Sequence, residues 1–317
     1  MKRLTAAAIG FGLTLAVLGC NSIPWIRDNG NNNRDVDPAF TKREPQAQDL
    51  VAVMNMNARK VQGIQSAKVA LDVKQGNETP VGIDGMLACQ KPRSFRLKGK
   101  AASADVADLG SNDNEFWFWV APPGSGKPPV YHCDYKDMAT GKVPLPFPFN
   151  PDVVLCALNI ADYNPNAQYR VQSNQQVIEL IEATKSLQGQ DITKVTVFNR
   201  GEVTATRPRV LAYVLKDKQG KDICSAQILE TQTNRETGAV LPVRVKIVFN
   251  GEKAADRVEM TMKLYDIQPT ATPLPQERTA ALFSRRDLSH LESYDLARGA
   301  DKPSASSMSI QRTSGRD

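Results

Sequence analysis

The sequence predicts a mainly β fold of the α+β class, with about ten to twelve antiparallel strands, one N-terminal helix and a few short helices. Apolar and polar residues alternate in residues 69–74, 243–249 and 258–264, which is typical of strands with one buried and one solvated face. Short turns such as Gln75-Gly76-Asn77 and Asn250-Gly251-Glu252 follow runs of this kind. Connections this short join antiparallel hairpins, whereas parallel strands need long crossovers.

Two helices are expected beside the strands. Residues 46–64 carry apolar side chains at three- and four-residue steps, which share one face of a helix: Leu50, Val53, Met54, Ala58, Val61 and Ile64. Gly63 is expected to help end this helix. Further along, Asn150 and Pro151 fit the N-cap and the first position of a short apolar helix that reaches Leu158.

The N-terminus has the order of a bacterial secretory signal. Lys2 and Arg3 precede an uncharged apolar run over residues 4–18, which Gly19 and Cys20 follow. The last four residues of this segment resemble a lipobox, so the mature protein is expected to begin at Cys20 with acyl chains (palmitate) on its thiol and amine. A plain cleaved signal and an uncleaved anchor helix are the alternatives, although about 15 apolar residues are fewer than the ~20 that span a bilayer. The sequence therefore predicts a lipid-anchored protein of the bacterial cell envelope.

Composition divides the chain into four parts. They are a signal peptide over residues 1–19, a lipidated flexible tether over 20–45, a folded domain over 46–296 and a disordered tail over 297–317. The formal charge of +6 comes from basic residues interleaved with acidic ones, which does not indicate a nucleic-acid surface. A monomer without a nucleic-acid partner is expected.

The remaining cysteines are possible disulfide partners, because exported proteins fold where disulfides can form: Cys89, Cys133, Cys156 and Cys224. Four cysteines allow three pairings, and the sequence does not choose between them. Neither their spacing nor the two histidines match a metal site. No metal and no other cofactor is therefore expected.

No catalytic constellation is recognisable in the sequence. The run Gly124-Ser125-Gly126-Lys127 has Ala121 and Pro128 where a phosphate loop needs glycine and Ser or Thr. There is no Gly-x-Ser-x-Gly elbow, and neither histidine has a suggestive serine or carboxylate context. The protein is therefore expected not to be an enzyme.

Two strand-like runs are apolar on both faces, residues 115–120 and 209–215. One interpretation is a central strand that is covered by a helix on one side and by the core on the other. The second interpretation is a strand that lines a hydrophobic cavity, as in a barrel whose mouth is crossed by helices. The cavity candidates are Phe116, Trp117, Phe118, Trp119, Leu211 and Tyr213.

Three stretches resemble the LolA/LolB-type lipoprotein carriers. Gly85, Leu87, Lys91-Pro92 and Phe95 follow the family's spacing Gly-x-Leu-x-x-x-(Arg/Lys)-Pro-x-x-Phe. About twenty residues later come the family's aspartate, aromatic run and proline, here Asp113, Phe116-Trp117-Phe118-Trp119 and Pro122. Late in the chain, Gly238, Leu241-Pro242-Val243, two long alternating strands and Phe283 are also similar to this superfamily. The resemblance covers roughly residues 46–288.

The resemblance implies an unclosed antiparallel β-barrel with lid helices and a hydrophobic interior that holds acyl chains of lipids or lipoproteins. Lys91 stands where the family's basic residue couples cavity opening to ligand transfer, so it is the gating candidate, although lysine lacks the planar fork of arginine. A lipidated chain is similar in topology to LolB, the anchored acceptor. LolB-type proteins insert an apolar loop into the membrane, for which residues 144–149 are the candidate here, with a packed proline-rich crossover as the alternative.

The expected function is non-enzymatic binding of acyl chains in envelope lipoprotein localisation or lipid transfer. By the sorting logic of the family, Asn21 after Cys20 favours the outer membrane, with the domain facing the periplasm. The alternative is a structural or interaction lipoprotein on the same scaffold, whose core is filled by its own side chains.

Overall fold

A computed structural model describes residues 44–121, 126–141, 143, 145 and 151–298. The predicted signal peptide, Cys20 with its acyl chains, and nearly all of the predicted tether and tail lie outside the described residues. The same holds for the apolar loop candidate, of which only Leu145 is described.

One sheet forms the framework of the described chain. Its strands are β1 (Gly63–Gln75), β2 (Val81–Gln90), β3 (Ser94–Ala101), β4 (Ala104–Ser111), β5 (Glu115–Val120), β6 (Val130–Asp134), β7 (Tyr169–Ser173), β8 (Val177–Lys185), β9 (Asp191–Asn199), β10 (Val210–Asp217), β11 (Asp222–Thr233), β12 (Val240–Phe249), β13 (Val258–Tyr265), β14 (Gln268–Thr270) and β15 (Ser293–Asp295).

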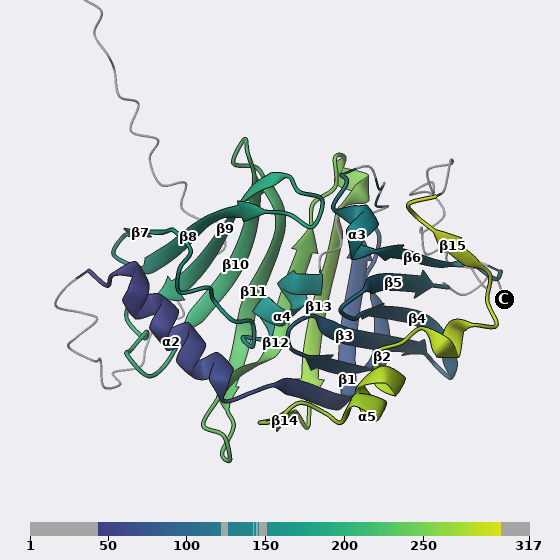
Figure 1. The fold of residues 1–317 in the computed structure, drawn as a ribbon, viewed down its shortest axis with the longest axis horizontal. Coiled ribbons are helices and arrows are strands. Elements are labelled where there is room, and N and C mark those ends of the chain that lie inside the picture. The colour runs from purple at the N-terminus through teal and green to yellow at the C-terminus, as the bar shows by residue number, and fades with distance from the viewer. Residues whose placement is uncertain (1–43, 122–125, 142, 144, 146–150, 299–317) are drawn as a thin grey trace, which may run out of the picture. The chain divides into compact units, whose positions relative to one another are not determined.

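The sheet is antiparallel and unclosed, as the sequence predicts. Its order is β15-β6-β5-β4-β3-β2-β1-β13-β12-β11-β10-β9-β8-β7, and β14 pairs with part of β1 (Figure 1). The parallel pair β15–β6 is the exception to the antiparallel arrangement within the described residues. Fifteen strands exceed the ten to twelve expected, in part because β14 and β15 have three residues each, too few to show an alternating pattern.

Helices are few: α2 (Ala47–Arg59), α3 (Tyr135–Met138), α4 (Pro151–Ala157) and α5 (Gln276–Leu282), with single turns η1 (Ala254–Asp256) and η2 (Arg286–Leu288). The helix predicted over residues 46–64 ends earlier, because Gly63 already begins β1. A Cβ atom on Gly63 would lie 2.7 Å from the carbonyl oxygen of Cys89 on β2, so glycine permits this close pairing. Among the described residues, no helix has the length and hydrophobicity that crossing a membrane requires.

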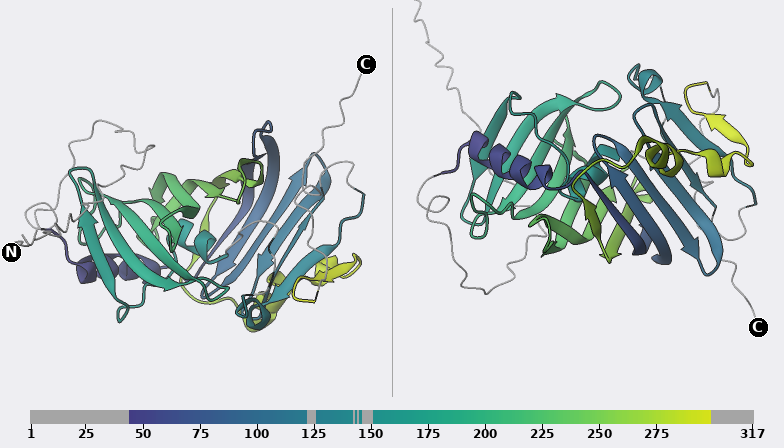
Figure 2. Two further views of the ribbon diagram at one scale, coloured as in Figure 1. Left: turned by 90° about the horizontal axis from the view of Figure 1, so that it is seen from above. Right: turned by 60° about the horizontal axis from the view of Figure 1, so that its bottom comes forward.

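One face of the sheet carries the main core and is called the inner face here. Its side chains include Leu87, Phe118, Tyr213 and Ile247, all of which are buried. The helices α2 and α4 add their buried side chains to the same cluster, with α2 beside β7 and α4 near the middle of the sheet (Figures 1 and 2). The core therefore lies between the inner face and these two helices.

The opposite, outer face of β3–β5 holds a buried ion pair. The guanidinium of Arg96 donates to both carboxylate oxygens of Asp108, at 3.2 and 2.7 Å, and the indole nitrogen of Trp117 donates to the same carboxylate. Gly110 makes room for the Trp117 ring, because a Cβ atom there would lie 2.0 Å from a ring carbon. The side chains of Arg96 and Asp108 are 4% and 5% exposed.

The C-terminal segment covers this ion pair. Arg96 also donates to the carbonyl oxygen of Leu282, at the end of α5, and to the carboxylate of Asp287 in η2. Leu288 and Leu291 pack with Trp117 and Trp119 in a small separate cluster. Figure 2 shows the segment from α5 to β15 beside the strands β2–β6. The outer network therefore fixes the C-terminal segment to this part of the sheet.

The four cysteines considered as disulfide partners are free, buried thiols. Burial raises the pKa of the Cys89 thiol to about 12, and this thiol donates to the carbonyl oxygen of Ile64 at 3.7 Å. Burial also raises the pKa of Cys133 to about 12. In the structure all four thiols pack as small apolar side chains of the main core.

We expect Arg96→Ala to destabilise the protein strongly, by about 3–5 kcal/mol, because it leaves the Asp108 carboxylate buried without its cation. Urea unfolding followed by circular dichroism measures this loss. The matched control is Lys100→Ala, whose partner Asp105 lies 3.5 Å away with both side chains more than half exposed. That change is expected to cost less than about 1 kcal/mol, and equal losses in the two variants would contradict the buried network.

We expect the four thiols to resist a thiol reagent at pH 8 in the native protein carrying Cys20→Ser, because burial keeps them protonated and inaccessible. In denaturant without reductant, all four should react. If two or fewer thiols react in denaturant, disulfides form between these cysteines.

Candidate ligand-binding site

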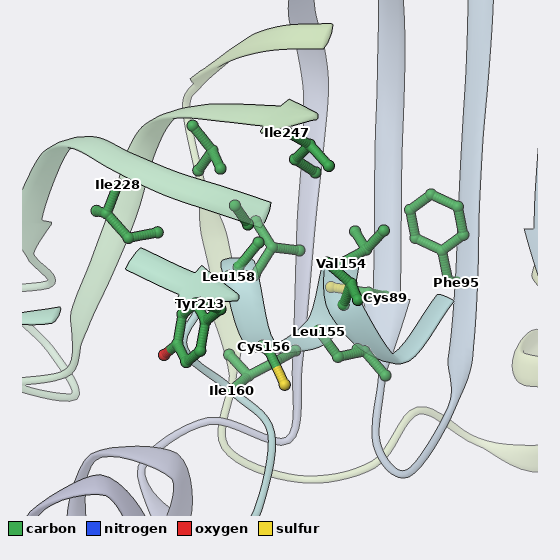
Figure 3. Packing of buried hydrophobic residues seen from close by; sticks show 14 of the residues in the cluster. Cys89, Phe95, Val154, Leu155, Cys156, Leu158, Ile160, Tyr213, Ile228 and Ile247 are labelled. Carbon is green, nitrogen blue, oxygen red and sulfur yellow. The ribbon is translucent and has the colours of Figure 1, made fainter. Parts of the chain in front are cut away.

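The inner face is occupied at its centre by α4. All residues of this seven-residue helix except Asp152 are buried. In Figure 3, Val154, Leu155 and Cys156 lie between Cys89 and Phe95 on one side and Tyr213, Ile228 and Ile247 on the other. α4 therefore fills the space between the two halves of the inner face with its own side chains.

The ends of α4 are set by local sequence. Pro151 stands at the first helical position, where its missing N–H costs nothing, and Asp152 places a negative charge in the first turn. After the helix, Asn159 has a φ of 62°, a left-handed conformation that asparagine tolerates better than most residues. The chain therefore turns at Asn159 and leaves the inner face towards α2.

Two asparagines tie this turn to α2 and the sheet. Asn57 of α2 donates to the carbonyl oxygens of Asn159 and Val240, and the Val240 N–H donates back to Asn57 at 2.8 Å. Asn159 donates to the same carbonyl of Val240 and accepts a 2.8 Å hydrogen bond from the hydroxyl of Tyr213. Both asparagines are at most 3% exposed. This network is satisfied and buried, so it fixes α2 against β12 and β10.

A second set of contacts holds the segment that follows α4, and Lys91 is part of it. The Lys91 ammonium donates to the carbonyl oxygen of Ala58 near the end of α2, at 2.8 Å, and to the carboxylate of Asp162 at 2.7 Å. The Lys91 side chain is 9% exposed, whereas that of Asp162 is 62% exposed. Next to Asp162, the backbone of Tyr163 exchanges two hydrogen bonds of 2.8 Å with the side-chain amide of Asn55. Lys91 thus lies where α2 meets residues 160–163.

A third contact holds the start of α4. The guanidinium of Arg93 pairs with Asp152 at 3.0 and 3.3 Å and stacks over the ring of Tyr135 at 4.6 Å. The side chains of Arg93 and Asp152 are 34% and 40% exposed, so water screens this ion pair. Lys91 and Arg93 flank Pro92, and together they hold both ends of the inner segment.

A pocket of about 450 Å³ lies between α2 and residues 162–169. Asn55 and Arg59 of α2 line one side, and Asp162, Tyr163 and Tyr169 line the other. The rings of Tyr163 and Tyr169 are 6.5 Å apart. This pocket is therefore adjacent to the segment that α4 and Lys91 hold in place.

Three of the six predicted cavity residues lie on the inner face. Phe118 stacks on Tyr131 with ring centres 5.2 Å apart, and Phe116 packs against Tyr135. Tyr213 lies beside α4, with its hydroxyl bonded to Asn159. These three residues contribute to the cluster that α4 completes.

Trp117, Trp119 and Leu211 do not share that space. Trp117 and Trp119 point to the outer face, where the C-terminal segment covers them, because neighbouring residues of a strand face opposite sides. Leu211 lies at a break in the register between β9 and β10, where Val210 pairs with Phe198 and Ala212 with Val197. This bulge places Val210 in the core cluster and leaves Leu211 half-buried outside it.

Several residues of the site gave no clear signal in the sequence. Asn57 and Asn159 are polar residues within apolar surroundings, and only the fold shows that they bind each other. Glu182 and Lys194 form an ion pair on the inner face, although charges on strands usually indicate solvent. Within the described ranges, no group of three or more His, Cys, Asp or Glu side chains is placed to hold a metal ion.

The fold is similar to several solved structures at low sequence identity. A LolA superfamily protein from Nitrosomonas europaea matches 72% of this chain and 96% of its own, with 12% identity and a TM-score of 0.43. A putative outer membrane lipoprotein-sorting protein domain from Vibrio parahaemolyticus matches 74% and 98%, with 9% identity and a TM-score of 0.48. A DUF1329 family protein from Desulfovibrio piger matches 78% and 99%, with 11% identity and a TM-score of 0.47.

No protein-family model matches the sequence, and a comparison with curated proteins finds no significant match. The first two solved structures bear descriptions of the kind that the sequence motifs resemble. With TM-scores below 0.5, these likenesses carry no argument about what the chain binds, which has to come from the geometry of the inner face.

Proposed function

We propose that this chain binds acyl chains of lipids or lipoproteins on the inner face of its sheet, in the space that α4 fills. The observation that carries the proposal is α4 itself. It is a short apolar helix that fills the middle of the inner face, and it is joined to the sheet through side chains rather than through strand pairing. Binding is non-covalent and involves no chemical step.

The energies of the two occupants are comparable. Burying Val153, Val154 and Leu155 contributes about 5–9 kcal/mol, taking about 1.5–3 kcal/mol for each side chain. An acyl chain gains about 0.8 kcal/mol for each buried CH₂, so 16 carbons supply about 13 kcal/mol before the cost of immobilising the ligand. An acyl chain can therefore replace α4 on the inner face, and α4 can return when the acyl chain dissociates.

The contacts at the ends of α4 are suited to such an exchange. The ion pair Arg93–Asp152 and the pair Lys91–Asp162 each have at least one partner that is 40% exposed or more, so water can solvate that carboxylate when the contact breaks. We infer that Lys91 acts as the gating residue, because one ammonium joins α2 to the segment after α4.

The membrane setting of the proposal comes from the sequence. An acylated Cys20 would hold the domain at a bacterial envelope membrane, facing the periplasm, and Asn21 favours the outer membrane. In that setting, a monomer would receive acyl chains from lipids or lipoproteins and pass them on.

The second candidate is a structural or interaction lipoprotein with a permanently filled core. The observation in its favour is that α4 and its neighbours already bury the inner face completely enough to leave Leu158 and Ile160 at 0% exposure. The two candidate functions therefore differ in whether α4 can move away from the inner face.

We expect the Cys20→Ser chain, purified from bacterial extract, to carry lipid. Native mass spectrometry should show adducts with the masses of acyl lipids, and the protein should also take up a pyrene-labelled dodecanol. Absence of both adducts and probe uptake would contradict acyl binding and favour the filled core.

We expect Lys91→Met to speed the association of pyrene-labelled dodecanol about tenfold or more, because a hydrogen bond to a charged group contributes about 1.5–3 kcal/mol to the closed state. Stopped-flow fluorescence measures the rate. The matched control is Lys98→Met, which removes a lysine bonded to Asp287 at 2.8 Å on the outer face. Equal rates in the parent and the Lys91 variant would show that this lysine does not gate the site.

A further inference from the structure

A positive charge lies on the apolar inner face, next to the proposed acyl site. Lys194 of β9 pairs in register with Glu182 of β8 on one side and with Leu215 of β10 on the other. Its side chain is only 18% exposed, and that of Glu182 is 17% exposed. Charged side chains are rare at such depth unless they are paired, because removing them from water is costly.

The present partners of Lys194 are the Cys156 thiol on α4, which shares a hydrogen bond with it, the Glu182 carboxylate and the Tyr163 ring. The distance from its nitrogen to the nearer Glu182 oxygen is 4.0 Å, longer than a hydrogen bond. The ammonium also lies 4.4 Å from the ring centre of Tyr163. Burial lowers the pKa of Lys194, but the influence of Cys156, Tyr163 and Glu182 outweighs burial and raises this pKa. Because Cys156 belongs to α4, displacement of α4 would remove its hydrogen bond to Lys194 and leave the 4.0 Å pair with Glu182 as the ionic contact of this ammonium.

The position of Lys194 connects the pocket with the inner face. Tyr163 and Tyr169 line the pocket of about 450 Å³, and the Lys194 ammonium lies over the Tyr163 ring. Tyr169 is the register partner of Glu182 across β7 and β8. A ligand whose tail lies on the inner face in place of α4 would therefore have its polar end close to Lys194, with the pocket beside it.

We infer that Lys194 binds the anionic group of an acyl ligand, a carboxylate or a phosphate attached to the chain. The inference rests on the proposed acyl-binding function and adds the chemical class of its ligand. A bound anion at hydrogen-bond distance would make a charge-assisted contact that is stronger than the present 4.0 Å pair. Glu182 acts in the opposite sense, because its carboxylate repels the same group and so favours release.

Two probes with the same tail test this inference, a pyrene-labelled dodecanoic acid and the corresponding dodecanol. In Lys194→Met, we expect the dissociation constant for the acid to rise about tenfold or more and that for the alcohol to change less than twofold. In Glu182→Gln, the acid should bind more tightly, because a like charge is removed. The matched control is Lys185→Met on the same hairpin, whose 64% exposed lysine pairs with Asp191 and should affect neither probe.

The outcomes separate this inference from the function on which it rests. If neither probe binds the parent protein, acyl binding and the role of Lys194 both fail. If both probes bind and Lys194→Met weakens them equally or not at all, acyl binding stands and the role of Lys194 is overturned. Thermal melting checks that each variant folds, and Lys194→Gln replaces Lys194→Met if the latter does not fold. Competition by dodecanoate and by dodecyl phosphate then shows whether the carboxylate or the phosphate is the preferred group.

Discussion

The structure depends on the burial of α4 against one apolar face of an open sheet. A closed barrel covers its inner face by itself, whereas a sheet with two free edges needs other elements to do so. A seven-residue helix is too short to be stable alone in water, so α4 forms because the sheet receives its side chains. The inner face in turn stays out of water because α4 is present. Sheet and helix therefore stabilise each other, and another apolar molecule in the place of the helix would cover the same part of the sheet.

The two sides of the sheet are held by contacts of different kinds. On the outer face of β3–β5, Arg96 and Asp108 are almost fully buried and also fix the C-terminal segment, so breaking this network leaves a charge without water. Around α4, by contrast, the ion pairs of Lys91 and Arg93 each have a partly exposed partner. The molecule thus combines a buried outer ion pair with inner ion pairs whose carboxylates are partly exposed to water.

The alternation of apolar and polar residues predicted the strands of the sheet. It could not assign the two faces of a strand where both faces are buried. β12 and β13 alternate clearly, since their outer residues include Arg244, Lys246 and Lys263. In β9, however, Val195 and Val197 on the outer face are as buried as Phe198 on the inner face, so a pattern of polarity could not assign the faces. The same ambiguity in β5 placed Trp117 and Trp119 in the predicted cavity.

The short helix from Pro151 was predictable because proline and aspartate mark its start. The asparagine network that receives its end was not, because it depends on residues about 80 to 180 positions apart.

Tyr163 contacts both the residues that close the proposed acyl site and the ammonium of Lys194. Its backbone is held by Asn55 of α2, next to the pair Lys91–Asp162, and its hydroxyl shares a 2.7 Å hydrogen bond with Thr196 of β9. Its ring forms a wall of the pocket and covers the ammonium of Lys194. If an acyl chain binds as proposed, a movement that breaks the contacts of Lys91 and Asn55 and the hydrogen bond to Thr196 would shift this ring and uncover Lys194. The apolar space and the cation would then become available together, so a ligand with an acyl tail and an anionic group would meet both at once. A small anion without a tail would gain nothing from the apolar space.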